Sequence, residues 1–321
     1  MSEINLVFPG QGSQFVGMAR NLMETTIAKE MMEKADETLG FSISKLMLAG
    51  PSEQLGLTTY TQPAIVTHSL ILFELLKEIL KKKNYSVHMV LGHSVGEYSA
   101  LSTAGVMSFE QALLATHTRG KAMQEAVPAG RGCMYALLKA PLSIVEKACR
   151  ETQGIVEIAN YNSEKQVVIS GQNEACQAAL LLMEKMCKQE NLSSIRAIKL
   201  AVSAPFHSSM MKPAEEKMTE FFKAQKLCAN KLPYIANYDA QLYPVGTTGE
   251  KIQDNLIKQI CGSVLWTQSI QKLENDYKII EVGPGSVLKG LMKSIDSKLN
   301  VLSFDPNFSW QQTTETIDQF L

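Results

Sequence analysis

The sequence lacks an excess of charge of either sign. Its 321 residues include 31 lysines and arginines and 32 aspartates and glutamates, which gives a net charge of −1. Proteins whose main partner is nucleic acid or an anionic membrane usually present a basic surface, so we expect neither partner here. With 45% hydrophobic residues, the chain is nevertheless long and apolar enough to bury a sizeable core, as one large domain or two unequal ones.

Long apolar runs are missing as well. The most apolar helical segment, residues 64–80, is interrupted by one histidine and three charged residues, and is therefore too short and too charged to span a bilayer. The first residues go directly into a strand-like run, without the basic segment and long apolar stretch of a secretory signal. We therefore expect a cytoplasmic protein.

Sequence signatures of metal and dinucleotide binding are also missing. Six cysteines are scattered without the spacing of metal ligands or of a disulfide framework, and we expect them to be reduced. Two glycine-rich segments lack the third glycine of a dinucleotide fingerprint, because Phe15 and Leu288 occupy its position. We predict no metal site and no cofactor.

What the sequence does contain is an alternation of short apolar runs and longer helical patterns, which is typical of an α/β fold with a mostly parallel sheet. The predicted strands of this large sheet are residues 4–8, 87–91, 234–236, 278–282 and 301–304. The predicted helices beside it are residues 18–39, 62–81, 95–104, 108–125, 212–225 and 251–260.

The middle of the chain has a different order of elements: strand, helix, strand, strand, helix, strand. This is the split βαβ order of a ferredoxin-like domain, and its predicted elements are residues 132–138, 142–151, 155–159, 166–170, 174–188 and 194–200. We therefore predict a ferredoxin-like small subdomain, residues 128–202, inserted into a hydrolase-like large domain formed by residues 1–127 and 203–321.

A candidate nucleophile lies in Gly92-His93-Ser94-Val95-Gly96, between a predicted strand and a predicted helix. In this context G-x-S-x-G places the serine on a sharp turn, where larger flanking residues would collide with the strand and the helix. The turn aims the hydroxyl at the positive end of the following helix, where developing negative charge is stabilised. The pentapeptide alone is compatible with a chance match, but the elements around it favour Ser94 as a nucleophile.

A serine nucleophile needs a base, and the chain has five histidines. His207 follows Ser94 in the chain and lies in a predicted loop between a strand and a helix, the order of α/β-hydrolase-like sites. A purely structural loop histidine is the alternative interpretation. The less suitable candidates lie within predicted helices or strands or beside the nucleophile: His68, His88, His93 and His117. No acid stands out as a third member, so a backbone carbonyl or an amide side chain could orient the imidazole.

Acyl transfer also requires two donors for the tetrahedral oxyanion. The backbone amide of Val95, directly after the nucleophile, is placed to be one of them. The glycine-rich loop 8–14 follows the first predicted strand and could supply the amide of Gln11 as the other. Taken alone, this loop is equally compatible with a plain strand-to-helix turn.

Six segments together resemble the malonyl-CoA:acyl carrier protein transacylases of type II fatty acid synthesis and the related acyltransferases of polyketide assembly. They occur in the family's order from near the start of the chain to near its end, which makes the resemblance specific. The matching segments are FPGQGSQ (8–14), GHSVGEYSA (92–100), TRGKAMQ (118–124), NYNSEKQVVISG (160–171), VSAPFHSSMM (202–211) and EVGPGSVLKGL (281–291).

The resemblance implies transfer of a malonyl group from malonyl-CoA to acyl carrier protein, with these two molecules as partners. It implies Ser94 as nucleophile, His207 as base, and the amides of Gln11 and Val95 as oxyanion donors. It also implies that Gln259 offers its backbone carbonyl to the histidine, although the following Cys-Gly-Ser segment differs from the family's pattern.

The same resemblance implies a set of residues that contact or shape the substrate. Arg119 would hold the malonyl carboxylate in a bidentate pair, and Phe206 would leave little room for a 2-methyl branch. The remaining expected substrate-binding positions are His93, Asn162, Asn237 and Met123.

Two other functions compete with acyl transfer. A hydrolase acting on acyl carrier protein in a polyketide pathway would use the same site, with water in place of the second thiol. Such hydrolases are expected to lack the carboxylate-binding arginine, so Arg119 favours transfer. A non-catalytic docking module is disfavoured because Ser94, His207 and Arg119 are all present.

Overall fold

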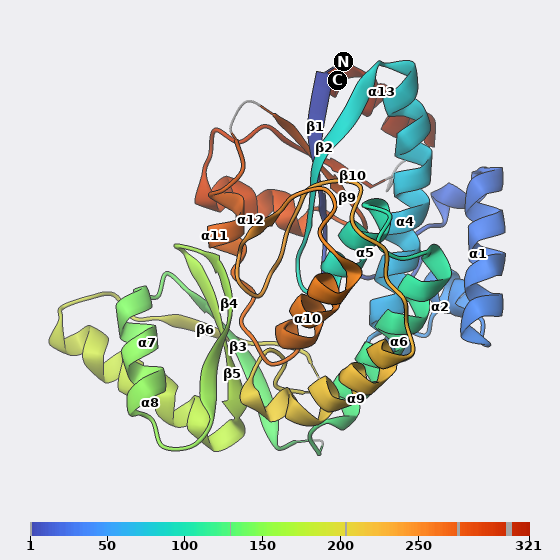
Figure 1. Cartoon of the computed structure of the whole chain (residues 1–321). Helices are drawn as coiled ribbons and strands as arrows, with labels where there is room; N and C mark the ends of the chain where they lie inside the picture. Colours follow the sequence, from blue (N-terminus) through green and yellow to red (C-terminus); the bar gives the residue numbers. More distant parts are fainter. Residues whose placement is uncertain (1, 129, 203, 275–276, 306–309) are drawn as a thin grey trace.

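The computed structural model describes residues 2–128, 130–202, 204–274, 277–305 and 310–321. Two sheets organise the described chain, a larger one in the upper half of Figure 1 and a smaller one below it to the left. Among these residues no helix is long and apolar enough to cross a membrane.

The larger sheet has the strand order β10-β9-β1-β2-β7-β8. Its neighbouring strands pair in parallel from β10 to β7, and only the short edge strand β8 is antiparallel. The bounds are β1 Ser2–Phe8, β2 Tyr85–Gly92, β7 Tyr234–Ile235, β8 Leu242–Tyr243, β9 Lys278–Val282 and β10 Val301–Phe304. The central strand β1 is buried on both faces from Ile4 to Phe8, as is usual for a parallel strand covered by helices on both sides.

Helices cover both faces of this sheet. Leu6 and Phe8 belong to a large core shared with α4 and α5, whereas Val7 packs on the opposite face with Trp266 of α11 and Leu288 of α12. The helices of this part are α1 Thr26–Leu39, α2 Ile43–Ala49, α3 Ser52–Leu55, α4 Thr58–Lys82, α5 Gly96–Thr103, α6 Phe109–Glu125, α9 Lys212–Lys223, α10 Gly249–Gln259, α11 Trp266–Ile270, α12 Val287–Ile295 and α13 Trp310–Phe320, with 3-10 helices η1 Asn21–Glu24 and η2 Ser209–Met211.

The smaller sheet is antiparallel and has the order β4-β5-β3-β6. Its elements follow one another as β3 Gly132–Leu138, α7 Leu142–Glu151, β4 Val156–Ser163, β5 Gln166–Gln172, α8 Asn173–Gln189 and β6 Arg196–Lys199. Apolar residues of the strands and both helices form a core separate from that of the larger sheet. This arrangement confirms the predicted α/β class with a ferredoxin-like insertion.

The predicted subdomain boundaries themselves stay predictions. The boundary residue Ser203 and, in the preceding hinge, Ala129 lie outside the described residues. The structure differs from the sequence prediction at the first helix, which was expected to begin at residue 18. Helix α1 begins only at Thr26, because Thr25 is extended and its side chain accepts a hydrogen bond from the Ala28 amide, which is the geometry of a helix N-cap.

Several short elements were not predicted from the sequence, namely α2, α3, α11, α12, α13 and β8. Helix α12 is the informative case, because its N-terminus follows the Gly283–Gly285 turn. The buried carboxylate of Glu281 accepts hydrogen bonds from the amides of Leu288 and Lys289 at 2.8 and 2.9 Å. A carboxylate six residues before the first residue of a helix can cap the N-terminus only when the turn folds back, and no local sequence pattern shows this.

Candidate active site

The structure places Ser94 on a turn between β2 and α5, with the positive φ of 52°. The turn has room for neither flanking glycine to carry a side chain. A Cβ on Gly92 would lie 2.0 Å from the Gly96 backbone, and a Cβ on Gly96 would lie 2.1 Å from the carbonyl oxygen of Phe8. The close contact of β1, β2 and α5 therefore forces the glycines that the motif contains, and it leaves the Ser94 hydroxyl above the end of the sheet.

Asn237 holds this turn from the side. Its Oδ1 accepts a hydrogen bond from the Ser94 amide at 2.6 Å, and its Nδ2 donates to the Gly92 carbonyl at 2.5 Å. The side chain is 1% exposed, so water does not compete for these bonds. One amide side chain thus fixes the two backbone groups on either side of His93.

His207 lies beside the Ser94 hydroxyl. Its Nε2 is 2.8 Å from Ser94 Oγ, and its Nδ1 is 2.9 Å from the Gln259 carbonyl oxygen and 3.1 Å from that of Gly262. Carbonyl oxygens only accept hydrogen bonds, so Nδ1 carries the proton and Nε2 is left as the acceptor for the serine. The imidazole is therefore held in the tautomer of a general base without a carboxylate.

The electrostatic surroundings keep this imidazole neutral. Burial and, to a smaller extent, the positive charge of Arg119 together lower the pKa of His207 to about 3, against the opposing effect of the two carbonyl contacts. At neutral pH the ring therefore has a free lone pair for the serine proton.

Arg119 projects from α6 toward the same hydroxyl. Its Nη2 lies 3.2 Å from Ser94 Oγ and 2.9 Å from Gln259 Oε1, and the guanidinium carbon lies 5.7 Å from the centre of the Tyr98 ring. The side chain is 1% exposed, and it forms no ion pair with any residue that the structure describes. A buried guanidinium with no carboxylate of its own is suited to an anionic ligand.

The glycine-rich loop after β1 packs against the serine turn. A Cβ on Gly10 would lie 2.5 Å from the His93 carbonyl oxygen, and the His93 amide donates to the Phe8 carbonyl at 2.9 Å. The Gln11 side chain is tied to α4, since its Nε2 donates to Thr58 Oγ1 at 3.3 Å. The loop that carries the Gln11 amide therefore borders the turn that carries the nucleophile.

These residues surround a cavity of about 290 Å³ between the two sheets. Seven predicted site residues line it: Gln11, His93, Ser94, Arg119, Met123, Phe206 and His207. Four others, Val95, Asn162, Asn237 and Gln259, are absent from the lining. Asn162 Oδ1 instead accepts a hydrogen bond from His93 Nε2 at 2.8 Å, so Asn162 contacts a residue of the cavity lining without lining the cavity itself.

Part of the cavity lining was not predicted from the sequence. Gln62 of α4, Met134 of β3 and Asn160 of β4 all face the cavity. Gln62 lies in the helical segment that was predicted from its apolar pattern, and its Nε2 approaches Met123 Sδ at 3.8 Å. The sequence signal that could have identified Gln62 is the presence of a glutamine in an otherwise apolar helical pattern.

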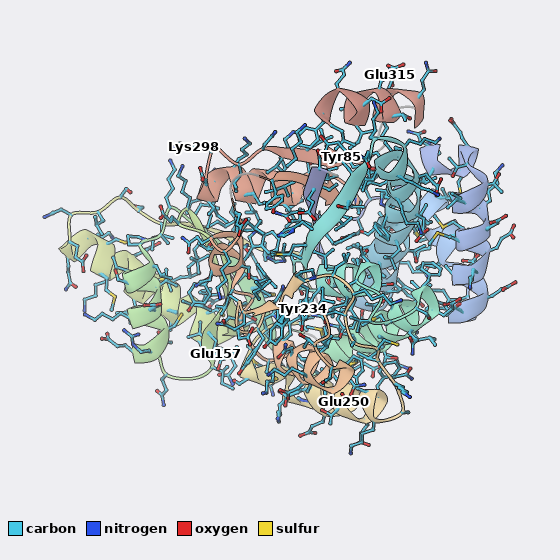
Figure 2. The ribbon with its side chains drawn as sticks, turned by 45° about the horizontal axis from the view of Figure 1, so that its top comes forward. Tyr85, Glu157, Tyr234, Glu250, Lys298 and Glu315 are labelled. Atoms are coloured by element: carbon cyan, nitrogen blue, oxygen red, sulfur yellow. The ribbon has the colours of Figure 1, made fainter. Side chains whose placement is uncertain are left out.

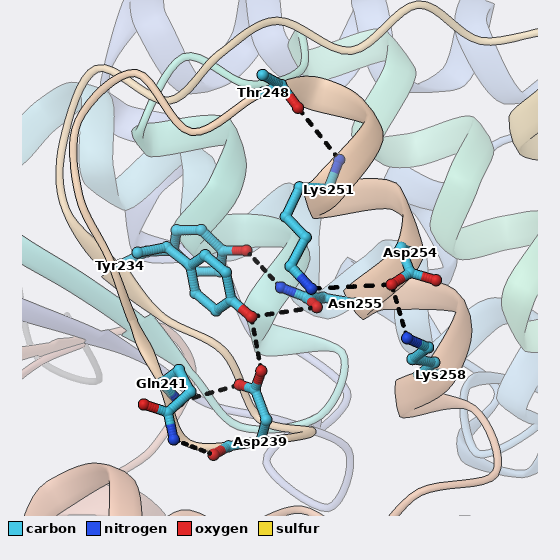
Figure 3. A network of polar contacts seen from close by, with 9 residues as sticks. Tyr234, Asp239, Gln241, Thr248, Lys251, Asp254, Asn255 and Lys258 are labelled. Carbon is cyan, nitrogen blue, oxygen red and sulfur yellow. Dashed lines mark hydrogen bonds and ion pairs between the residues drawn. The ribbon is translucent and has the colours of Figure 1, made fainter.

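Gln259 ends helix α10, which is anchored to the strands β7 and β8. Asn255 Nδ2 donates to the hydroxyl of Tyr234 at 3.1 Å, and the Tyr243 hydroxyl donates to Asp239 Oδ2 at 2.6 Å and lies 3.4 Å from Asn255 Oδ1 (Figure 3). Tyr234 lies inside the fold in Figure 2, whereas Glu250, at the other end of α10, is exposed. The network fixes the helix end from which Gln259 reaches His207.

Fold and geometry together define an α/β enzyme with a serine–histidine pair for acyl chemistry and a buried cation beside it. The chain matches the acyl transferase domain family over residues 6–304. The malonyl CoA-acyl carrier protein transacylase of Bacillus subtilis is 40% identical over 310 residues, which are 94% of this chain and 93% of the relative.

Solved structures give the same result. An acyl carrier protein S-malonyltransferase from Vibrio cholerae superposes with a TM-score of 0.84 at 37% identity, covering 95% of this chain and 97% of that one. A malonyl-transacylase solved in complex with a type II polyketide synthase acyl carrier protein superposes with a TM-score of 0.88 at 34% identity, covering 98% and 100%. The chain therefore belongs to the acyl transferase family, and within it to the malonyl CoA-acyl carrier protein transacylases.

Proposed function

We propose that this acyltransferase moves a malonyl group from malonyl-CoA to the pantetheine thiol of an acyl carrier protein, through an ester on Ser94. The observation that carries the proposal is the position of Ser94 Oγ, 2.8 Å from His207 Nε2 and 3.2 Å from Arg119 Nη2. The hydroxyl thus lies between a neutral base and an unpaired buried cation. The names of the relatives, which specify malonyl, coenzyme A and acyl carrier protein, support the same substrates.

In the first half-reaction, Ser94 Oγ attacks the thioester carbonyl while His207 Nε2 takes the hydroxyl proton. The backbone amides of Gln11 and Val95 are the proposed donors to the tetrahedral oxyanion. Collapse of this intermediate breaks the carbon–sulfur bond, and His207 returns its proton to the departing thiolate of coenzyme A. The products are malonyl-Ser94 and free coenzyme A.

In the second half-reaction, the pantetheine thiol gives its proton to His207 and its sulfur attacks the ester. The carbon–oxygen bond to Ser94 breaks, and the serine recovers the proton. No step needs an oxidant, a metal or another cofactor. The two substrates bind in turn to one site, so the steady-state kinetics are expected to be ping-pong.

Substrate choice follows from the lining of the cavity. Arg119 is proposed to hold the malonyl carboxylate, and Phe206 is proposed to limit branching at the carbon between the two carboxyl carbons. The cavity is lined both by strands of the smaller sheet, for example at Met134 of β3, and by helices that accompany the larger sheet, for example at Arg119 of α6. This supports the proposed division into a large domain and an inserted subdomain with the site between them.

The test is a mass spectrum of the intact protein after brief mixing with malonyl-CoA, with Ser94→Ala as control. We expect a malonyl adduct on the unaltered protein alone, which persists in buffer and moves to added carrier protein bearing its pantetheine arm. Steady release of coenzyme A without an adduct and without carrier would instead show that the protein is a hydrolase.

A further inference from the structure

A second buried ionisable group lies below the nucleophile and takes no part in the mechanism above. Glu97 is in the first turn of α5 and is 1% exposed. Its Oε2 accepts hydrogen bonds from Gln259 Nε2 at 2.5 Å and from the Asn237 amide at 3.3 Å. Its Oε1 is buried without a hydrogen-bond partner among the described residues. A carboxylate in such a place is costly unless a positive charge lies nearby.

The nearby positive charge is that of Arg119, which Glu97 reaches through one amide. Gln259 Nε2 donates to Glu97 Oε2 and to the Ser94 carbonyl at 3.1 Å, while Gln259 Oε1 accepts from Arg119 Nη2 at 2.9 Å. A flipped amide would turn its NH₂ toward the guanidinium and its oxygen toward the carboxylate, so both contacts would become repulsive. The charges on either side therefore fix the orientation of Gln259.

This arrangement keeps the guanidinium charged and leaves it free for a ligand. A direct ion pair would occupy the donors that a substrate carboxylate needs, whereas the intervening amide uses only one hydrogen of Nη2. Arg119 Nε is buried with no hydrogen-bond partner among the described residues. The unpartnered Nε of Arg119 and the carboxyl of Glu97 belong to one network, in which Glu97, Gln259 and Arg119 are each at most 1% exposed.

We propose that Glu97 is a positioning residue that serves as the counter-charge of Arg119 through Gln259, and that its ionisation weakens the binding of a carboxylate-bearing acyl group. The inference rests on the proposed function, since it concerns the malonyl carboxylate at Arg119. Two carboxylates that share one guanidinium repel each other, so the ligand is held most tightly when Glu97 is protonated.

The protonation of Glu97 changes within the working pH range. Burial raises its pKa to about 7, against the opposing effects of Gln259, the Asn237 amide and Arg119. The titratable and charged groups that face it are Tyr98 on its own helix, Arg119 on α6, Tyr234 on β7, Asp239 in the turn after β7, and Tyr243 on β8. Below pH 7 the carboxyl is mostly neutral, and above pH 7 it competes with the ligand for Arg119.

Binding and protonation are then linked in both directions. If ionised Glu97 weakens malonyl binding by about tenfold, a bound malonyl group raises the pKa of Glu97 by about one unit. Malonyl-CoA binding near pH 7.5 therefore takes up roughly half a proton from the buffer. A neutral acetyl group has no carboxylate at Arg119 and produces no such uptake.

The experiment is isothermal titration calorimetry of malonyl-CoA and acetyl-CoA on Ser94→Ala protein, which cannot be acylated. Titrations between pH 6 and 9 in buffers of different ionisation enthalpy give both the Kd and the protons exchanged. For malonyl-CoA we expect a Kd that rises up to about tenfold across this range and an uptake of roughly half a proton at pH 7.5. Glu97→Gln in the same background should give a low, pH-independent Kd and no uptake.

The controls separate this inference from the proposed function. Glu250→Gln neutralises an exposed glutamate at the other end of α10 and should keep the pH dependence. Acetyl-CoA measures the pH dependence and proton exchange that come from the ionisable groups of coenzyme A itself, which both ligands contain. Malonyl binding with no difference from acetyl in its pH dependence or proton uptake would overturn the role of Glu97 alone, and this comparison does not require the Glu97→Gln protein to fold. Failure of malonyl-CoA to bind at any pH would overturn the proposed function and, with it, this inference.

Discussion

Replacing Arg119 with alanine should reduce malonyl transfer far more than acetyl transfer. The substitution removes the contacts of Nη2 with Ser94 Oγ at 3.2 Å and with Gln259 Oε1 at 2.9 Å. These losses affect every acyl group, since they concern the nucleophile and its supporting amide. The additional loss of the guanidinium–carboxylate pair affects malonyl-CoA alone.

The size of the difference follows from the burial of the side chain. A hydrogen bond to a charged group is worth about 1.5–3 kcal/mol, and a guanidinium that is 1% exposed is little screened by salt. Two such bonds to a bidentate carboxylate give about 3–4 kcal/mol after discounting for non-additivity. This corresponds to a selective loss of roughly 10²–10³-fold in kcat/KM for malonyl-CoA.

The assay compares kcat/KM for malonyl-CoA and acetyl-CoA with the same carrier protein. Arg119→Lys serves as the second variant, because it keeps the charge and loses the fork geometry. We expect an intermediate malonyl selectivity for it. Equal losses for the two acyl groups in Arg119→Ala would refute the carboxylate role and leave Arg119 with a general effect on the nucleophile. Thermal unfolding of both variants checks that the fold is retained.

Three further predictions concern the elements around Ser94. Gly96→Ala brings a Cβ to 2.1 Å from the Phe8 carbonyl and should abolish activity and lower the Tm, whereas Gly290→Ala, with nothing within 4 Å, should leave both nearly unchanged. Asn237→Ala removes the hydrogen bonds to the Ser94 amide and the Gly92 carbonyl and should lower kcat about 10–100-fold. An unchanged kcat would show that the turn keeps its conformation without Asn237. Because the pKa of His207 is lowered to about 3, the base stays neutral above that pH, and the single-turnover acylation rate should show no loss on acidification through pH 6.5. If the acylation rate instead fell with a midpoint near pH 6.5, the imidazole of His207 would have the pKa of an exposed histidine, which would contradict its burial beside Arg119.

The chemistry of the site was largely predictable from short sequence patterns. Ser94 follows from a motif whose two glycines are required by the contact of β1, β2 and α5. The parallel sheet and the inserted subdomain follow from the order of apolar periods, since each element must bury an apolar face. These features are local, or they repeat along the chain, and a single sequence contains both kinds of information.

The side-chain partners of the site were not predictable in the same way. Neither the Glu97–Gln259–Arg119 network nor the contact of His207 with the Gly262 carbonyl has a local pattern. Glu97 and Gln259 are 162 residues apart in the chain, and Arg119 and Gln259 are 140 apart. The sequence resemblance implied the Gln259 carbonyl as a partner of the histidine but contained nothing about its side-chain amide.

The sequence by itself determined which residue types the site contains and on which elements they lie, because backbone turns and apolar periodicity depend on neighbours within a few positions. The tertiary structure decided which buried charges face one another and through which atoms. That information depends on how the end of α10 meets α5 and α6, where burial removes water and leaves each polar atom to find its partner within the protein. That packing places the buried carboxyl of Glu97 one amide away from the guanidinium of Arg119.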